Sequence, residues 1–445
     1  MRSLTLLALL GAPYAAFAAR ILALTDPALS SRADLSFDTF WTALRDEGHE
    51  LVVKDVQDAA LDLDERSTTS PPYEHLILFA PEAKQVPKHL TPQLLANRLS
   101  THPSSSLLLV LSPNSAEVWR DFAREFEVDP DEKGQVVVDR FNAVSSTGDE
   151  RGTTFSVPVS SSPAAWLSPS TRSSAAPLLY RGGAHLAGRN PLLQPALFAA
   201  SSAFSADADS DAPPEEVRIA GSSAALVSTF QARNNARVGF VGSAEIFSDG
   251  FLSLDGRPTG NLPFLLDLAR FVFQQTGQLR VESSKHVNAA TGEEGAPMYK
   301  VGTEVTYLVK ISSSPDVPSP LPGALQAEFT MLDPHLRVPL LPLPHSSHPP
   351  SLPNSTVYGA TFRAPDRHGV FTLSLSYLRP QLGLTFLTDT HTVSVTPPNH
   401  NEYDRFIVGA TPYYVGAASV SVGFAMFVVL WTLAGAPVEG REKRE

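Results

Sequence analysis

The run FIVGATPYYVGAASVSVGFAMFVVLWTLAGAPV, Phe406 to Val438, holds thirty-three residues and not one charged side chain. A helix that crosses the hydrocarbon core of a bilayer needs about 20 predominantly apolar residues, and this run exceeds that length. A buried core helix is the alternative, but such helices are usually shorter and seldom apolar on every face. The sequence therefore predicts one transmembrane helix at residues 410–436, with nearly all of the chain on one side of a membrane.

The other end of the chain indicates which side that is. Arg2 precedes an apolar run at residues 4–10, and Ala16-Phe17-Ala18 supplies the small residues of a cleavage site. These features are typical of a secretory signal peptide, which we assign to residues 1–19. The tail at 437–445 contains three Lys or Arg residues, whereas the twenty residues before Phe406 contain only Arg405. This asymmetry favours a cytosolic tail and a single-pass type I protein.

Length and composition limit the number of domains, the chemistry and the partners of the translocated region. Its length of roughly 385 residues exceeds what one hydrophobic core usually serves, so two or three domains are expected. The chain has no cysteine, which excludes disulfides and thiolate chemistry. Its formal net charge of −12 argues against nucleic acid as a partner.

Residues 20–281 alternate between strand and helix patterns. The segment 20–24 is a short apolar strand, and Phe37, Phe40, Trp41 and Leu44 then share one face of a helix. Strands alternating with helices predict a mainly parallel, doubly wound sheet of the Rossmann or flavodoxin kind. We expect surface loops at the Ser/Pro/Ala-rich segment 160–177 and at the acidic segment 205–216. The other predicted strands are 51–53, 76–79, 107–111, 178–182, 225–230 and 238–241, and the other predicted helices are 91–99, 119–126 and 261–272.

Residues 282–402 change to a period of two. Apolar side chains alternate along 305–311, 325–331, 371–377 and 391–395, with no helices between them. Several short strands of this kind predict an antiparallel β-sandwich-like domain. Eleven prolines from Pro315 to Pro353 predict that most of that stretch is loop, since proline lacks the N–H that a strand donates.

Motifs for catalysis or cofactor binding are missing from the sequence. No Gly-x-Gly-x-x-Gly follows a strand, and neither a phosphate-binding Gly-x-x-x-x-Gly-Lys-Ser/Thr nor a Gly-x-Ser-x-Gly is present. His345 and His348 lie among prolines that prevent a regular helix from aligning both on a metal. We expect no catalytic residue, metal site or cofactor in this chain. Asp-x-Asp pairs, which we interpret as solvated loop acids rather than ligands of a divalent cation, occur at Asp62/Asp64, Asp129/Asp131 and Asp207/Asp209/Asp211.

A glycosylation sequon, Asn354-Ser355-Thr356, lies in the region predicted to be translocated. It sits beside the proline-rich stretch, where a loop would expose it. Asn354 is therefore a candidate N-glycosylation site.

The segment QARNNARVGFVGSAEIFSDGF, Gln231 to Phe251, resembles the signature of one family. Together with stretches at 179–182, 260–273, 366–377, 403–407 and 412–414, it extends the resemblance from about residue 20 to the C-terminus. The family is the large non-catalytic subunit of the oligosaccharyltransferase complex, of the wheat-germ-agglutinin-binding-protein (DDOST) type. The Ser/Pro-rich segment, the acidic insertion and the proline-rich loop depart from the family pattern.

The resemblance implies a role in protein N-glycosylation at the endoplasmic reticulum membrane. The family's complex transfers a preassembled oligosaccharide from dolichyl diphosphate to Asn in Asn-x-Ser/Thr of nascent chains, and a different, multi-spanning subunit performs the transfer. This chain would then support assembly, with the other subunits and the membrane as partners and its bulk in the lumen. The resemblance leaves a contact with the dolichyl-linked oligosaccharide open. From the residues alone, a type I receptor or adhesion protein and a membrane-tethered luminal enzyme remain as alternatives.

Polar residues of the signature are candidates for a luminal contact with a partner subunit or glycan. Asn-Asn before an apolar strand is also ordinary turn chemistry, and Ser248-Asp249-Gly250 is also a good turn sequence. A structural role is therefore the alternative for each. The candidates are Arg233, Asn234, Asn235, Arg237 and Asp249.

Two further features concern the membrane. Gly416, Ser419 and Gly423 are small residues that would let another helix approach the transmembrane helix closely. Arg441 and Lys443, fifth and third from the end of the chain, resemble a basic retrieval signal. Stop-transfer charges are the alternative for the second feature.

Overall fold

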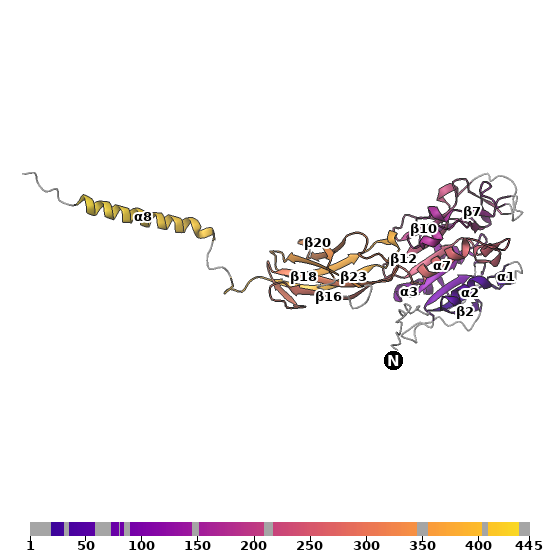
Figure 1. The fold of residues 1–445 in the computed structure, drawn as a ribbon, viewed down its shortest axis with the longest axis horizontal. Coiled ribbons are helices and arrows are strands. Elements are labelled where there is room, and N and C mark those ends of the chain that lie inside the picture. Colours follow the sequence, from indigo (N-terminus) through magenta and orange to yellow (C-terminus); the bar gives the residue numbers. More distant parts are fainter. Residues whose placement is uncertain are drawn as a thin grey trace, which may run out of the picture.

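The computed structural model describes residues 19–30, 35–57, 73–79, 81–83, 90–144, 151–208, 217–344, 355–402 and 408–435. This part of the chain forms an α/β domain, a β-sandwich and a C-terminal helix (Figure 1). Several residues singled out in the sequence lie outside it: the predicted signal peptide up to residue 18, Asp62, Asp64, Asp209, Asp211, His345, His348, Asn354, Arg441 and Lys443.

The α/β domain is built on a nine-stranded sheet. Neighbouring strands from β2 to β13 are parallel, and the remaining strands form an antiparallel extension beside β13. The mainly parallel sheet expected from the sequence is therefore confirmed. Its order is β2 (Glu50–Asp55), β1 (Arg20–Thr25), β3 (His75–Phe79), β4 (Ser106–Val110), β13 (Arg237–Val241), β12 (Ala225–Gln231), β9 (His185–Ala187) and β5 (Val128–Pro130), with β10 (Leu193–Phe198) also paired to β12.

Helices cover both faces of this sheet. In β1, Ile21 and Ala23 enter one core, which contains side chains of α2 (Asp38–Asp46) and α7 (Asn261–Val272). Leu22 and Leu24 enter the core on the opposite face, which contains side chains of α3 (Pro92–Thr101) and α4 (Glu117–Arg124). Burial on both faces explains why the strands are almost continuously apolar. The shorter elements are α1 (Pro27–Ser30), β6 (Gln135–Val138), β7 (Phe155–Val157), α5 (Pro169–Arg172), β8 (Leu178–Tyr180), β11 (Phe204–Asp207), α6 (Asp249–Leu252), β14 (Ser253–Leu254) and β15 (Arg257–Pro258).

The segment 160–177 corrects one expectation. Its composition predicts a surface loop, but Trp166 and Leu167 are buried in the core. The Trp166 ring stacks on Phe271 of α7 with centroids 5.4 Å apart, and Ser168 Oγ donates to Asp267 Oδ2 of α7 at 2.6 Å. Together with Ala164, these apolar side chains place a Ser/Pro-rich segment in the core, and Ser168 beside them bonds to α7.

The β-sandwich follows along the chain and has its own core. Alternate residues of β18 and β22, such as Tyr307, Val309 and Leu373, point into it. Neighbouring strands are antiparallel, except that β17 runs parallel to β23. Strand β20 lies inside the proline-rich stretch that the sequence predicts to be mostly loop. The strand order is β16 (Leu279–Asn288), β18 (Glu304–Ser313), β21 (Ser355–Arg363), β20 (His335–Pro342), β19 (Leu325–Thr330), β22 (Gly369–Tyr377), β23 (Leu387–Thr396) and β17 (Met298–Lys300).

The C-terminal helix α8 (Thr411–Ala434) belongs to an apolar span of 27 residues, Val408–Ala434, which has no buried residues and contains an 18-residue stretch with a mean hydropathy of 2.0. At 1.5 Å per residue the span is about 40 Å long, which exceeds the roughly 30 Å hydrocarbon core of a bilayer. The described part of the chain therefore has one helix suited to single-pass anchoring. Figure 1 shows α8 beyond the sandwich, at the end opposite to the α/β domain.

Candidate functional site

The signature segment forms the hairpin between β12 and β13. Its turn closes with a hydrogen bond from the Ala232 N–H to the Ala236 carbonyl, 2.8 Å long. Asn235 adopts a left-handed backbone with φ of 72°, which Asn tolerates better than most residues. Asn234 Nδ2 donates to the Leu99 carbonyl at the end of α3 at 2.8 Å. The hairpin is thus fastened to the helix beside it.

The same hairpin holds the β-sandwich. Gln231 Nε2 donates to the Leu384 carbonyl at 2.9 Å. The Asn235 side chain makes two hydrogen bonds with the backbone of Phe386. Its Nδ2 donates to the Phe386 carbonyl at 3.0 Å, and its Oδ1 accepts from the Phe386 N–H at 2.6 Å. Leu384 and Phe386 lie just before β23 of the sandwich. We call Gln231, Asn235, Arg237 and residues 383–386 the domain joint.

Arg237 is the central residue of this joint. Its side chain is fully buried, and its guanidinium carbon lies 4.1 Å from the ring centroid of Phe271. One terminal nitrogen donates to the carbonyls of Phe271 at 2.7 Å and Thr276 at 3.0 Å, and the other donates to Gly383 at 3.3 Å. Burial lowers the pKa of Arg237 to about 9, against the opposing attraction of Asp316, so the group is still charged at neutral pH.

The remaining signature candidates lie elsewhere. Asp249, at the start of α6, accepts a hydrogen bond from the Thr39 N–H at 3.1 Å and so connects α6 to α2. Partial burial acts to raise the pKa of its carboxyl, but hydrogen bonds from Ser36 and Thr39 outweigh it and the pKa is lowered. Arg233 is exposed at the tip of the hairpin and has no polar contact with any described residue.

A small crevice opens at the carboxyl ends of the parallel strands β4 and β13, the edge where open α/β sheets bind ligands. It has about 280 Å³ of empty space, including its open mouth. Ser112 follows β4, Gly242 follows β13, Gly183 precedes β9, and Arg120 of α4 and Asp131 complete the wall.

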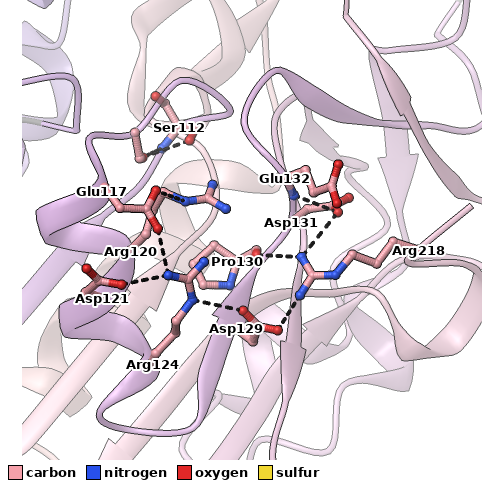
Figure 2. A network of polar contacts seen from close by, with 11 residues as sticks. Ser112, Glu117, Arg120, Asp121, Arg124, Asp129, Pro130, Asp131, Glu132 and Arg218 are labelled. Atoms are coloured by element: carbon pink, nitrogen blue, oxygen red, sulfur yellow. Dashed lines mark hydrogen bonds and ion pairs between the residues drawn. The ribbon is translucent and has the colours of Figure 1, made fainter.

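A network of arginines and acids lies beside this crevice and shares Arg120, Pro130, Asp131 and Glu132 with its wall (Figure 2). Arg124 pairs with Glu117 and Asp121, each at 2.7 Å, and with Asp129 at 3.2 Å. Arg218 pairs with Asp129 and donates to the Pro130 carbonyl at 3.0 Å. Arg218 also lies 3.7 Å from Asp131, so Asp129 and Asp131, the middle Asp-x-Asp pair of the sequence, are both occupied by arginine contacts. Asp131 is buried, so the expectation of solvated loop acids is wrong for it. Among the described residues no group of three His, Asp or Glu side chains could hold a metal ion.

Three polar side chains face the crevice with bonding capacity unused. Ser112 Oγ and His185 Nδ1 are buried and have no hydrogen-bond partner among the described residues. Arg120 is 5% exposed, and its Nε lies 3.2 Å from Glu117 Oε2 without hydrogen-bond alignment. Burial lowers the pKa of His185 to about 4, so its ring is neutral at pH 7. Buried polar groups are nearly always paired, so the crevice is suited to an ordered water or one polar group of a ligand.

The sequence does not reveal this crevice. The end of β4 was predicted, and Ser112 directly follows it. Arg120 and His185, however, come from segments that only the tertiary fold brings beside Ser112, and they carry no motif. The candidate Asp249 comes after β13 in the chain, but the structure places it against α2 rather than among the residues that line the crevice.

The apolar helix presents its small residues openly. A Cβ built on Gly416 or Gly423 would meet no described atom within 4 Å. Ser419 Oγ donates to the Gly416 carbonyl at 2.8 Å, which satisfies the hydroxyl inside the helix as a lipid environment requires.

A doubly wound domain locked to a β-sandwich, followed by one exposed apolar helix, defines the class of membrane-anchored proteins with a large two-domain extramembrane region. Residues 14–275 match the OST48 N-terminal domain and residues 285–435 match the OST48 middle domain. The chain belongs to the OST48 family.

Similar proteins span nearly the whole chain. The dolichyl-diphosphooligosaccharide–protein glycosyltransferase 48 kDa subunit of Caenorhabditis elegans is 29% identical over 432 residues, covering 91% of this chain and 91% of that protein. The subunit wbp1 of Schizosaccharomyces pombe is 30% identical over 404 residues, covering 89% of this chain and 89% of that protein. The Arabidopsis thaliana 48 kDa subunit is 29% identical over 422 residues, covering 92% of this chain and 91% of that protein.

Proposed function

We propose that this chain is a non-catalytic subunit of the oligosaccharyltransferase complex, which transfers a preassembled oligosaccharide from dolichyl diphosphate to Asn in Asn-x-Ser/Thr of nascent proteins. The observation that carries the proposal is the match of both folded domains to the OST48 family, whose relatives are named as subunits of this glycosyltransferase. The transfer itself is assigned to a different, multi-spanning subunit, and this chain supports and positions it.

The proposed location is the endoplasmic reticulum membrane, with the bulk of the chain in the lumen. Support comes from the signal-like residues 1–19, the C-terminal apolar helix and the tail with Arg441 and Lys443. Asn354 directly precedes β21 and is proposed to carry a glycan. Replacing Asn354 by Gln should increase electrophoretic mobility by one glycan, and unchanged mobility would show that the site is not used.

Contact with partner subunits is assigned to the helix and to the hairpin tip. Gly416, Ser419 and Gly423 form a small-residue face on α8 that another helix can approach. Arg233 offers an exposed guanidinium at the hairpin tip. Asn234, Asn235, Arg237 and Asp249 serve this proposal indirectly, because their side chains bond within the chain. Asn235 and Arg237 hold the two domains together, and Asn234 and Asp249 connect elements within the α/β domain.

The crevice is proposed to hold a polar group of the dolichyl-linked oligosaccharide. Gly183 allows a direct test, since a Cβ there would lie 3.7 Å from the Gln135 carbonyl and 3.8 Å from the Gly242 carbonyl. Gly183→Ala should therefore fill the crevice without a clash and raise the KM of the complete complex for its glycan donor, with kcat unchanged. Gly250→Ala, where the added Cβ meets nothing within 4 Å, is the control. Equal KM values for the two variants would remove the crevice from the proposal.

Purification tests the proposal as a whole. An epitope-tagged chain isolated in mild detergent should bring the catalytic subunit with it, and depletion of the chain should leave secreted glycoproteins lacking whole glycans. Glycans that are present but differently trimmed would argue against the proposal. Staining of the chain on unpermeabilised cells would favour the alternative of a type I receptor.

A further inference from the structure

The end of the sandwich that faces the membrane is fixed by the chain itself. Strand β23 ends at Thr396, whose carbonyl accepts from the Val301 N–H at 2.9 Å. Glu402 then pairs with Lys300 at the end of β17, and its Oε2 accepts from the Asn399 N–H at 3.0 Å. The chain therefore leaves the sandwich beside the end of β17.

The link to the membrane helix is short. The apolar span begins at Val408, six residue steps after Glu402, and a fully extended chain covers at most about 3.6 Å per residue. Glu402 consequently lies within about 20 Å of the first residue of the span. The end of the sandwich that carries Lys300 must stay near the surface of the bilayer that α8 crosses.

An apolar row lies near this same end, on the outer face of the sandwich. Val370 of β22 and Met298 of β17 both pair with Ser394 of β23, so their side chains point to the same face. Val370 is 61% exposed and Met298 is 57% exposed. Lys300 is two residues from Met298 along β17, which places the row about 7 Å from the end of the strand.

Leu332 extends the row. It is fully exposed and lies two residues past Thr330, which pairs with Thr372 of β22. Its neighbour Met331 packs so closely on Gly369 that a Cβ there would lie 2.3 Å from the Met331 sulfur. The turn at 331–334 is thereby held against the start of β22, beside Val370.

Strands β22 and β23 are otherwise polar on this outer face. Going away from the membrane end along β22 and β23, the outward positions are Thr or Ser only: Thr372, Ser374, Ser376, Thr388, Thr390 and Thr392. On these two strands the exposed apolar side chain, Val370, thus lies where the chain approaches the membrane, whereas Leu341 of β20 and Leu378 are exposed farther from that end. Solvent exposure of three large apolar side chains in one row is unfavourable unless something covers them.

Charges near the row are largely compensated. Arg367 pairs with Asp333 at 3.4 Å, and Arg337 pairs with Glu328 at 2.6 Å. Lys300 is paired with Glu402. This arrangement offers little net charge to acidic lipid headgroups, so any attraction to a bilayer would come from apolar contact.

We infer that Leu332, Val370 and Met298 form a membrane-docking row that rests in the interfacial layer of the bilayer crossed by α8. The occupant is lipid rather than another protein, because the short link keeps this end at the bilayer surface while the chain is anchored. The row gives the sandwich a second attachment to the membrane and restricts its tilt. The inference rests on α8 spanning a membrane and does not depend on the proposed role in oligosaccharide transfer.

Site-directed spin labelling of the full chain tests this inference, and the natural chain has no cysteine that would react. Single cysteines at Leu332, Val370 and Met298 are labelled in phosphatidylcholine nanodiscs. Collision with oxygen, which concentrates in lipid, is compared with collision with a water-soluble nickel chelate. Ser376→Cys lies on the same strand and face as Val370 but farther from the membrane end, and Val420→Cys in α8 defines the response of a lipid-exposed site.

Labels in the row should show an oxygen-to-nickel accessibility ratio several-fold above that at Ser376→Cys and nearer to that at Val420→Cys. Adding phosphatidylserine or salt should leave the ratio unchanged. Ratios equal to that at Ser376→Cys would overturn the inference. Labels shielded from both reagents would also overturn it, because they would indicate a second copy of the chain or another protein on the row.

Discussion

Replacing Arg237 by Met removes the three hydrogen bonds at the centre of the domain joint but keeps most of the side chain's volume. The Phe271 carbonyl retains a second donor, the Gln274 N–H at 3.1 Å. The carbonyls of Thr276 and Gly383 have no other donor among the described residues. Each buried polar group left unpaired costs about 1–3 kcal/mol. We therefore expect the variant to lose about 3 kcal/mol of unfolding free energy.

The tryptophans make this loss measurable domain by domain. Trp41, Trp119 and Trp166 are all buried in the α/β domain, Trp431 lies in α8, and the sandwich has none. Trp fluorescence in urea thus follows the α/β domain, whereas circular dichroism also follows the sandwich. At about 3 kcal/mol per molar, the expected loss lowers the fluorescence midpoint by about 1 M urea. The two probes should also separate, because the domains no longer unfold together.

Arg233→Met is the matched control, since it makes the same substitution at an exposed position of the same hairpin. Changes at such a position usually stay within about 0.5 kcal/mol. Measurements are made on the full chain in mild detergent at pH 7. Equal midpoints for the Arg237 and Arg233 variants would refute the conclusion that Arg237 holds the joint.

Two further predictions concern acid and the membrane helix. Burial, followed by the charges of His49 and Arg98, lowers the pKa of His75 to about 3. Because that folded-state pKa lies below the unfolded value of about 6.5, stability is complete above pH 6.5 and declines as pH falls toward 3. His75 should account for about 2 kcal/mol of the unfolding free energy lost between pH 7 and pH 5, and the His75→Phe variant should not show this part of the loss. The unfolding free energy is measured by urea titration at each pH, and the same pH dependence in both proteins would contradict the assignment. In α8, a Gly416→Leu/Gly423→Leu variant should still insert into membranes but should co-purify with less of the catalytic subunit. The control is Ala418→Leu/Ala425→Leu, which adds the same bulk to the opposite face of the helix. Equal recovery of the catalytic subunit by the two variants would count against a contact at the small-residue face.

Local patterns in the sequence predict much of this fold, and long-range contacts account for most of the rest. The strand at 107–111 is recognisable because a strand buried on both faces is continuously apolar. The β20 strand is not recognisable from the sequence, because prolines interrupt the alternation of apolar and polar residues. The domain joint leaves no trace in the sequence either: Arg237 and Asn235 bond to backbone atoms about 150 residues away, and a carbonyl acceptor can belong to any residue type. Polar residues that the sequence suggests are free to bind a partner can therefore form hydrogen bonds within the chain instead.

The sandwich has attachments at both ends, and this arrangement separates two roles that mutations can distinguish. Arg237 and Asn235 hold the α/β domain at one end, and the short link from Glu402 to Val408 holds the membrane at the other. With Leu332, Val370 and Met298 on the lipid, the height and tilt of the crevice above the bilayer would be fixed by contacts remote from the crevice itself. Loosening the joint should then move the crevice without altering Ser112, Arg120 or His185. A defect in complex activity caused by Arg237→Met but absent in Gly183→Ala would therefore assign the α/β domain a positional role, while the reverse pattern would assign it a binding role.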